Sequence, residues 1–394
     1  MEVKQIYTLM NSVSSEVLGR TDIVQEDLTG IVDMGTEVFN ANAVDNYVKS
    51  LVNHIGKVVF VNRPYSGKVP SVLMDSWEFG SVLEKISADI PEAHENKSWE
   101  LTDGTEYSQD VFHKPKVSAK FFNSRVTFEV PVSITERQVK ESFSNATQLN
   151  GFISMIHAAV EKSMTIKADA LIMRTINNMI AETLNADGEK FTPEAGSPVD
   201  YSTASTVRCV NLLKLYHDSV KPATALTAAN AITDPDFIRF ASYTMGLYAD
   251  RMQSISTLFN VGRKERFTPK DMLHVVLLSD FAKAAQTYLY SDTYNKEQVL
   301  LPNAETVPYW QGSGTGYAFA DNSNINVNSS SGANVNVSGV VGVMFDRDAL
   351  GVSNLDRRVT TNYNAKAEFF NNYYKFDCGY FNDTNENFVV FFVA

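Results

Sequence analysis

The sequence is poor in cysteine and contains neither a long apolar run nor a cluster of basic residues. Its 394 residues include two cysteines, Cys209 and Cys378, which lie far apart. They exclude a disulfide framework and a cysteine-rich zinc site, and we expect two buried free thiols. The longest apolar runs, such as 388–394, are far shorter than the roughly 20 residues of a membrane helix. With no signal peptide at the start, the pattern favours a soluble protein of a reducing compartment.

Acidic residues outnumber basic ones. The chain has 46 Asp and Glu against 34 Lys and Arg, which gives a net charge of −12. Nucleic-acid binding needs clustered Lys and Arg, so the composition argues against it. With 44% hydrophobic and 20% charged residues, the chain has a globular composition, and its length allows two or three domains.

Motifs for catalysis and metal binding are also missing. Gly67-Lys68 has no earlier glycine at the spacing of a phosphate-binding loop, and 312–316 leads into a polar hairpin rather than a helix. The triplet 346–348, Asp-Arg-Asp, is expected to be a turn with an internal ion pair. The six histidines show no zinc-binding spacing and are expected to be isolated helix or loop residues. They are His54, His94, His113, His157, His217 and His274. We therefore predict no catalytic, cofactor-binding or metal-binding residues, and no enzyme.

The strongest feature is a very long helix. Apolar residues recur with helical period from Leu149 to Leu184 without any proline, and Gly188 follows. At 1.5 Å per residue, this segment predicts a rod of roughly 55–60 Å. It lacks the charge pattern of a coiled coil. Such a rod is too long for the interior of one compact domain, so we expect it to run as a girder between subdomains.

The region before this helix reads as an arm and an extended loop. Residues 1–40 hold only short apolar clusters, and a helix is expected over 42–55. Residues 57–134 read as extended structure, including a short strand at 57–61, around a polar, acidic tip at 91–110. Strict alternation from Val126 to Ile134 predicts a strand, and Pro131 within it places that strand at a sheet edge.

Helices and strands alternate after the long helix. Ser202 or Thr203 is expected to cap a helix that runs through Tyr216, and Asp234 to cap one that begins at Pro235. A strand at 272–278 leads into a further capped helix. This order indicates a mixed sheet flanked by helices.

The last part of the chain is rich in asparagine and then in aromatic residues. Alternating Asn and apolar residues around 325–337 predict a small polar hairpin. A strand is expected at 340–345. The aromatic residues of 359–393 indicate an antiparallel sheet that closes the fold.

Three segments resemble the major capsid proteins of tailed bacteriophages, which have the Hong Kong 97-like fold. GVVGVMFDRDALGV at 339–352 is similar to that family's closing strand and charged turn, and NFVVFFVA ends the chain as its final strands do. IVDMGTEVFNANAVDNYVKSLVNHIGKVVF at 31–60 is similar to the arms of small tailed-phage capsid proteins. The order of the elements agrees along the whole chain. The resemblance implies an α+β fold with an N-terminal arm, an extended loop, a spine helix, a peripheral domain and an axial domain.

The resemblance also implies a division of the chain into five parts. These are 1–56, the arm and helix; 57–134, the extended loop; 135–200, the peripheral domain with the spine helix; 201–345, the axial domain with the hairpin 321–338; and 346–394, the C-terminal strands of the peripheral domain.

The function implied is that of a structural protein whose hexamers and pentamers form an icosahedral or prolate head around double-stranded DNA. Its partners would be further copies of itself, with scaffolding, portal and decoration proteins possible. It would be a virion protein assembled in the bacterial cytoplasm. No scaffolding segment precedes the arm, so a scaffold is expected to be separate or absent. A crosslink of the kind some relatives form would need a loop lysine such as Lys85 or Lys97, and we do not expect one.

Three other interpretations stay open from the residues alone. An encapsulin-like nanocompartment shell shares the fold and encloses enzymes instead of DNA. A soluble enzyme with a helical spine would need a polar pocket, and the missing motifs count against it. A tail or host-recognition protein would expose the Asn-rich hairpin as its site.

Overall fold

The structure is a computed structural model, and it describes most of the chain from residue 68 onwards. The described residues are 11–16, 18–19, 68–74, 83–91, 93–107, 110, 112–135, 146–192, 197–220, 226–290, 304–312, 316 and 318–394. Most of the expected arm, the helix expected over 42–55 and the strand expected at 57–61 lie outside this range. No helix in the described part is long and apolar enough to cross a membrane.

The chain forms two compact units, and it passes between them several times. One unit contains residues 1–78, 125–172 and 352–379, and the other contains 79–124, 173–351 and 380–394. The long helix α5 (Ala146–Ala186) contributes residues to both units. It begins three residues before the expected apolar period and ends two residues after it, so the predicted helix is confirmed.

The first unit holds a four-stranded sheet in the order β1-β11-β12-β4. The strands are β1 (Leu73–Met74), β11 (Leu350–Asn364), β12 (Phe369–Asn382) and β4 (Arg125–Thr135). β4 is an edge strand, as Pro131 predicts, and it pairs antiparallel with β12 so that Pro131 lies opposite Tyr373. Every second residue of β4 is at least partly buried, which confirms the alternation read from the sequence.

The second unit is built on a five-stranded sheet in the order β5-β13-β10-β6-β7. Its strands are β5 (Cys209–Asn211), β13 (Phe388–Phe392), β10 (Val340–Asp346), β6 (Leu273–Leu278) and β7 (Ala304–Val307). The central strands β10 and β13 are buried along their whole length, so each presents apolar side chains to both faces of the sheet. Both cysteines are free and buried, as expected.

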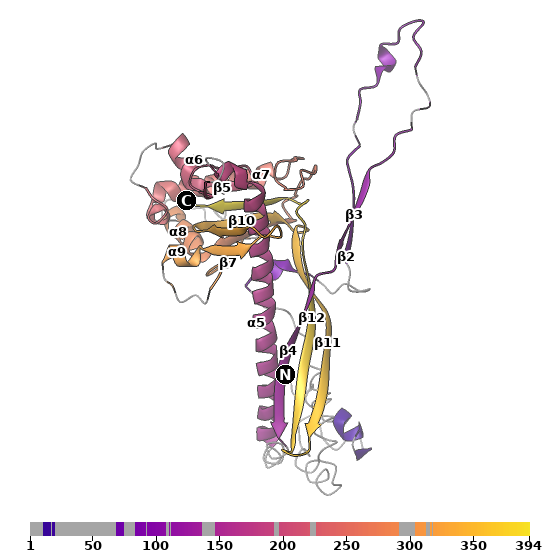
Figure 1. Ribbon diagram of the computed structural model, residues 1–394, viewed down its shortest axis with the longest axis vertical. Coiled ribbons are helices and arrows are strands. Elements are labelled where there is room, and N and C mark those ends of the chain that lie inside the picture. Colours follow the sequence, from indigo (N-terminus) through magenta and orange to yellow (C-terminus); the bar gives the residue numbers. More distant parts are fainter. Residues whose placement is uncertain are drawn as a thin grey trace. The chain divides into compact units, whose positions relative to one another are not determined.

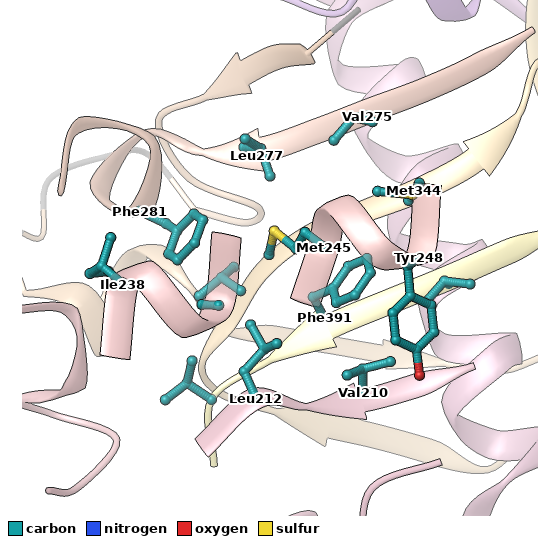
Figure 2. Close-up of a cluster of buried hydrophobic side chains, with 14 of the residues drawn as sticks. Val210, Leu212, Ile238, Met245, Tyr248, Val275, Leu277, Phe281, Met344 and Phe391 are labelled. Carbon is teal, nitrogen blue, oxygen red and sulfur yellow. The ribbon is translucent and has the colours of Figure 1, made fainter. Parts of the chain in front are cut away.

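Helices cover this sheet and bury its core (Figures 1 and 2). They are α6 (Leu212–Ser219), α7 (Pro235–Arg251) and α8 (Ser279–Tyr290), with a short α9 (Phe319–Asn322). Figure 2 shows Met245 and Tyr248 of α7 among side chains of the strands, including Phe391 of β13. The rings of Tyr248 and Phe391 meet edge to face with centroids 5.4 Å apart. Aromatic rings prefer this geometry, which adds to the gain from their burial.

The caps of α6 and α7 test two predictions. Asp234 caps α7, since its carboxylate accepts a hydrogen bond from the amide of Phe237 at 2.8 Å, and Pro235 opens the helix as expected. The predicted start of the preceding helix at Ser202 or Thr203 is wrong. Residues 209–211 pair with β13 instead, and Asn211 caps α6 by accepting from the amide of Lys214. Pairing with a buried strand therefore overrides the local capping signal.

The aromatic C-terminal segment does not form one antiparallel sheet, so that expectation is also wrong. β11 and β12 belong to the four-stranded sheet, whereas β13 pairs antiparallel with β10 and parallel with β5. The turn at 383–387 separates the two sets of strands. Its residues are all polar, and Asp383, Glu386 and Asn387 are buried.

The Asn-rich hairpin is confirmed. β8 (Ile325–Asn328) and β9 (Asn334–Val337) pair antiparallel, with Asn326 opposite Asn336 and Asn328 opposite Asn334. The asparagines are exposed, while Ile325, Val335 and Val337 are buried. The apolar positions thus hold the hairpin to the body of the protein.

A core substitution tests the importance of this packing. We expect Phe391→Ala to lower the free energy of unfolding by about 3–5 kcal/mol, because it leaves a cavity among fully buried side chains. Phe112→Ala is the matched control: its ring is 84% exposed, and the change should stay below about 0.5 kcal/mol. Denaturant unfolding of the unassembled chain measures both. Equal effects of the two variants would contradict the assigned core.

Candidate functional site

A two-stranded ribbon presents a mainly apolar face on one side and a pair of lysines on the other. β2 (Leu83–Ala88) pairs antiparallel with β3 (Val117–Phe122), and neither strand pairs with any other in the described residues. The residues described between 93 and 107 are exposed wherever their side chains are described, as expected for a solvated tip. β3 does not pair with β4, although only Asn123 and Ser124 separate them in the sequence. The ribbon is therefore a separate appendage of the second unit.

The outer face of the ribbon is apolar and exposed. Opposed residues in an antiparallel pair share one face of the ladder. The outer face consists of Glu84, Ile86, Ala88, Val117, Ala119 and Phe121. Ile86, Val117 and Phe121 are 65%, 60% and 63% exposed, and the ring of Trp99 nearer the tip is 96% exposed. Monomeric soluble proteins rarely leave a contiguous apolar face in water, so this face is a candidate contact surface.

The inner face of the ribbon carries two lysines directly opposite each other. Lys85 of β2 is the register partner of Lys120 of β3. Two like charges at opposed positions destabilise a strand pair unless another group compensates them. Asp383 provides that compensation, because one carboxylate oxygen lies 3.1 Å from the Lys85 Nζ and the other lies 2.9 Å from the Lys120 Nζ. One carboxylate therefore bridges both strands of the ribbon.

The acceptors come from the turn that joins β12 to β13. Asp383 and Glu386 are 2% and 8% exposed, and a buried carboxylate needs cations and donors around it. Glu386 accepts from Lys85 at 2.8 Å and from Arg266 at 3.3 Å. Asp383 also accepts from the backbone amide of Asn385, which fixes the shape of the turn. We call the group of Lys85, Lys120, Arg266, Asp383 and Glu386 the ionic joint.

Further contacts surround the ionic joint. Lys264 binds the carboxylate of Asp89, just beyond β2, at 3.0 Å. The rings of Phe122 and Phe381 lie 5.1 Å apart, which adds an apolar contact beside the charges. The joint thus attaches both strands of the ribbon to one turn and one loop of the body.

The charges of the joint shift the pKa values of Lys85 and Asp383. Burial alone would lower the pKa of Lys85, but the hydrogen bond and charge of Glu386, together with Asp383, raise it overall. Burial alone would raise the pKa of Asp383, but the hydrogen bond from Lys120 and the charge of Lys85 lower it overall. Both shifts favour the charged forms, so Lys85 and Asp383 stay ionised around neutral pH.

A second polar group lies behind the joint, at the end of β10. Thr268 donates to the carboxylate of Asp346 at 2.7 Å, and Asn387 donates to the Thr268 hydroxyl at 3.1 Å. Burial raises the pKa of Asp346, although the amide of Asp348 and Thr268 oppose the shift. The turn expected at 346–348 is present, but Thr268 and the Asp348 amide satisfy Asp346, rather than the expected Arg347. Thr268 is fully buried, so this network is a structural one that a substrate does not reach.

The sequence predicted no site residues, and the joint was missed. The sequence points to Lys85 only as a lysine that a crosslink would need, whereas the structure holds it in ion pairs with Asp383 and Glu386. Among the residues described, no group of three His, Cys, Asp or Glu is placed to hold a metal ion. His274 lies in the strand β6 beside Phe345, not in a helix or loop as expected, and burial lowers its pKa.

Comparison with known proteins shows the relationships of the chain. The family model of Phi29-like phage major capsid proteins matches residues 8–392. A chain in the capsid structure of Staphylococcus phage Andhra superposes with a TM-score of 0.52 at 7% identity, covering 85% of this chain and 86% of that one. A chain in the structure of the head fiber and inner core protein gp22 of native bacteriophage P68 covers similar shares, 85% and 86%, at 7% identity with a TM-score of 0.49. At such identities the likeness concerns the fold alone, and it rests on the Andhra structure.

One curated protein also matches part of the chain. The nonribosomal peptide synthetase easA of Emericella nidulans is 26% identical over 205 residues, which cover 50% of this chain and 3% of the synthetase. The chain therefore spans a very small share of that protein. This match carries no inference about activity.

The buried carboxylate of Asp383 should make the stability of the protein depend on pH. The pKa of Asp383 is lower in the folded protein than in the unfolded chain, where it is about 4. The charged carboxylate therefore stabilises the fold above that unfolded-state pKa, and this contribution is lost as the pH falls through the pKa of the folded state. We expect Asp383→Asn to lower the free energy of unfolding at pH 7 by about 2–4 kcal/mol, since the lysines left behind stay partly hydrated. The difference from the wild type should shrink towards pH 3.

The control is Asp218→Asn, which removes an exposed ion pair with Lys214 on α6. That pair should contribute less than about 0.5 kcal/mol. Denaturant unfolding at several pH values measures both variants. A gap between the wild type and Asp383→Asn that stays constant down to pH 3 would contradict the assigned role of the carboxylate.

Proposed function

The chain belongs to the family of Phi29-like phage major capsid proteins, and we propose that its copies assemble through the ribbon into hexamers and pentamers of a closed head that encloses double-stranded DNA. As a phage major capsid protein it is a structural component of the capsid shell. The observation that carries the finer proposal is the exposed apolar outer face of the ribbon, since no other two-stranded sheet among the described residues of the second unit leaves such a face in solvent.

The energetics of the outer face support association with another copy. Full burial of a Val, Ile or Phe side chain is worth about 1.5–3 kcal/mol, so Ile86, Val117 and Phe121 together would offset much of the cost of docking one ribbon. A two-stranded ribbon is marginal alone in water and needs a supporting surface. A neighbouring copy supplies one in a closed assembly, where every ribbon meets an equivalent site.

The charge of the chain fits an enclosing shell. The net charge of −12 is repeated in every copy, so the shell as a whole repels the phosphates of packaged DNA. The proposal therefore includes no sequence-specific contact with DNA. Assembly in the host cytoplasm, and scaffolding, portal and decoration partners, belong to the same proposal.

The five-part division of the chain extends this proposal. The ribbon 83–122 corresponds to the extended loop of 57–134, and α5 to the spine helix of the peripheral domain. The five-stranded sheet and its helices fall mostly within 201–345, the proposed axial domain. The arm, 1–56, would reach across neighbouring copies.

Substitution of Phe121 tests the role of the outer face. We expect Phe121→Asp to reduce the yield of closed particles at least about tenfold, because it buries a charge in the contact. The unfolding free energy of the unassembled chain should fall by no more than about 1 kcal/mol, since the ring is 63% exposed and the new carboxylate lies opposite Glu84 across the ladder. Density-gradient sedimentation and negative-stain electron microscopy of the expressed chain, with neighbouring gene products if a scaffold is required, measure the yield.

Phe121→Leu is the matched control, because it keeps an apolar side chain at the same position. It should form particles at close to the wild-type yield. Wild-type yield from Phe121→Asp would show that the outer face makes no essential contact. Failure of the wild type to form particles under every condition would overturn the assembly proposal itself.

A further inference from the structure

The ribbon has no backbone ladder to the body of its own subunit. β2 and β3 pair only with each other among the strands described. The backbone hydrogen bond from the Tyr380 amide to the Ser124 carbonyl continues the register of β12 and β4 by one pair, and it lies two residues beyond the end of β3. The ribbon strands themselves make no ladder to the body, so side-chain contacts at the base help to set the direction in which the ribbon points.

The ionic joint has the geometry to set that direction. A single ion pair would act as a pivot, about which the ribbon could rotate. Asp383 instead binds Lys85 on one strand and Lys120 on the other, and Glu386 holds Lys85 a second time. Lys85 also donates to the backbone carbonyl of Asp348 at 3.1 Å. Attachments on both strands of a paired ladder fix its rotation as well as its position.

The carboxylates favour the attached state. Without the ribbon, Asp383 and Glu386 would keep Arg266 as the one cation among the joint's members. Uncompensated buried carboxylates are costly, so detachment of the ribbon is disfavoured. The lysines, in contrast, are 22% and 39% exposed, so solvent and salt reach the joint from the ribbon side. The attraction between the lysines and the carboxylates is therefore strong at low salt and is weakened by screening at high salt.

We propose that this ionic joint fixes the angle of the ribbon on its own subunit before any neighbour binds, so that salt or the loss of Asp383 frees the ribbon without unfolding the body. A ribbon held in advance loses less conformational entropy when its outer face docks. The link to assembly rests on the proposed function. The joint itself belongs to the unassembled chain and can be tested there.

The test measures the distance between spin labels on the ribbon and on the body. Labels at Asp103→Cys in the tip and Lys270→Cys on the body both lie at exposed positions of the second unit. The native cysteines Cys209 and Cys378 are buried, and burial raises the pKa of both thiols, so they should stay unlabelled in the folded protein. Double electron–electron resonance on the unassembled chain gives the distribution of distances.

We expect one narrow distribution for the wild type at about 0.1 M salt, and at least about a twofold greater width at about 1 M salt, where screening acts within 3 Å. Asp383→Asn should show the greater width at both salt concentrations. Lys120→Gln, which changes the more exposed partner, should broaden the distribution as well. The variant that combines Asp383→Asn with Lys120→Gln should be little broader than Asp383→Asn alone, because both changes remove the same contact. Asp218→Asn should leave the distribution narrow.

Three results would overturn the proposal. They are a distribution that is already broad in the wild type at low salt, one that stays narrow in Lys120→Gln and in Asp383→Asn, and one that does not respond to salt. Particle formation is measured separately. A narrow wild-type distribution without particles would support the role of the joint and count against the proposed function. Particles with a broad wild-type distribution would support the proposed function and count against the role of the joint.

Discussion

Two buried carboxylates on one turn determine how the second unit presents its ribbon. Asp383 and Glu386 lie between β12 and β13, where the chain passes from one sheet to the other, and they are compensated by cations from distant parts of the sequence. Lys85 and Lys120 face inwards to meet them, and strand alternation then turns Ile86, Val117 and Phe121 outwards. The same alternation that satisfies the carboxylates therefore creates the apolar outer face. The anchoring of the ribbon and the exposure of its apolar outer face are two consequences of one register.

The core of the second unit holds the turn that carries Asp383 and Glu386 in place. β13 follows the turn directly and is buried at every position between β5 and β10. A shift of the turn would disturb β13, an inner strand of the sheet, so the core holds the carboxylates in place. A rigid body with an appendage that cannot bury its own apolar face suits a protein whose stability is completed by its neighbours. In such a protein, binding energy comes from repeated surfaces rather than from a pocket.

Local patterns predicted the elements that are determined by their own residues. The helical period through 149–184 without proline predicted α5, Asp234 and Pro235 predicted the start of α7, and Pro131 predicted an edge strand. Predictions failed where a distant segment decides the structure. Residues 209–211 pair with β13, and the aromatic residues near the C-terminus divide between two sheets. The joint was missed for the same reason, because Lys85 and Glu386 are 301 residues apart. Its one local signal was a pair of inward-facing lysines in two alternating strands.

The most direct test of the account is a single-particle electron microscopy reconstruction of particles formed by the wild-type chain. We expect each ribbon to keep Lys85 and Lys120 on the Asp383 and Glu386 of its own subunit, with Ile86, Val117 and Phe121 against a second copy. A shell in which the outer face of the ribbon remains in solvent, or in which the lysines bind the carboxylates of a neighbour, would contradict it.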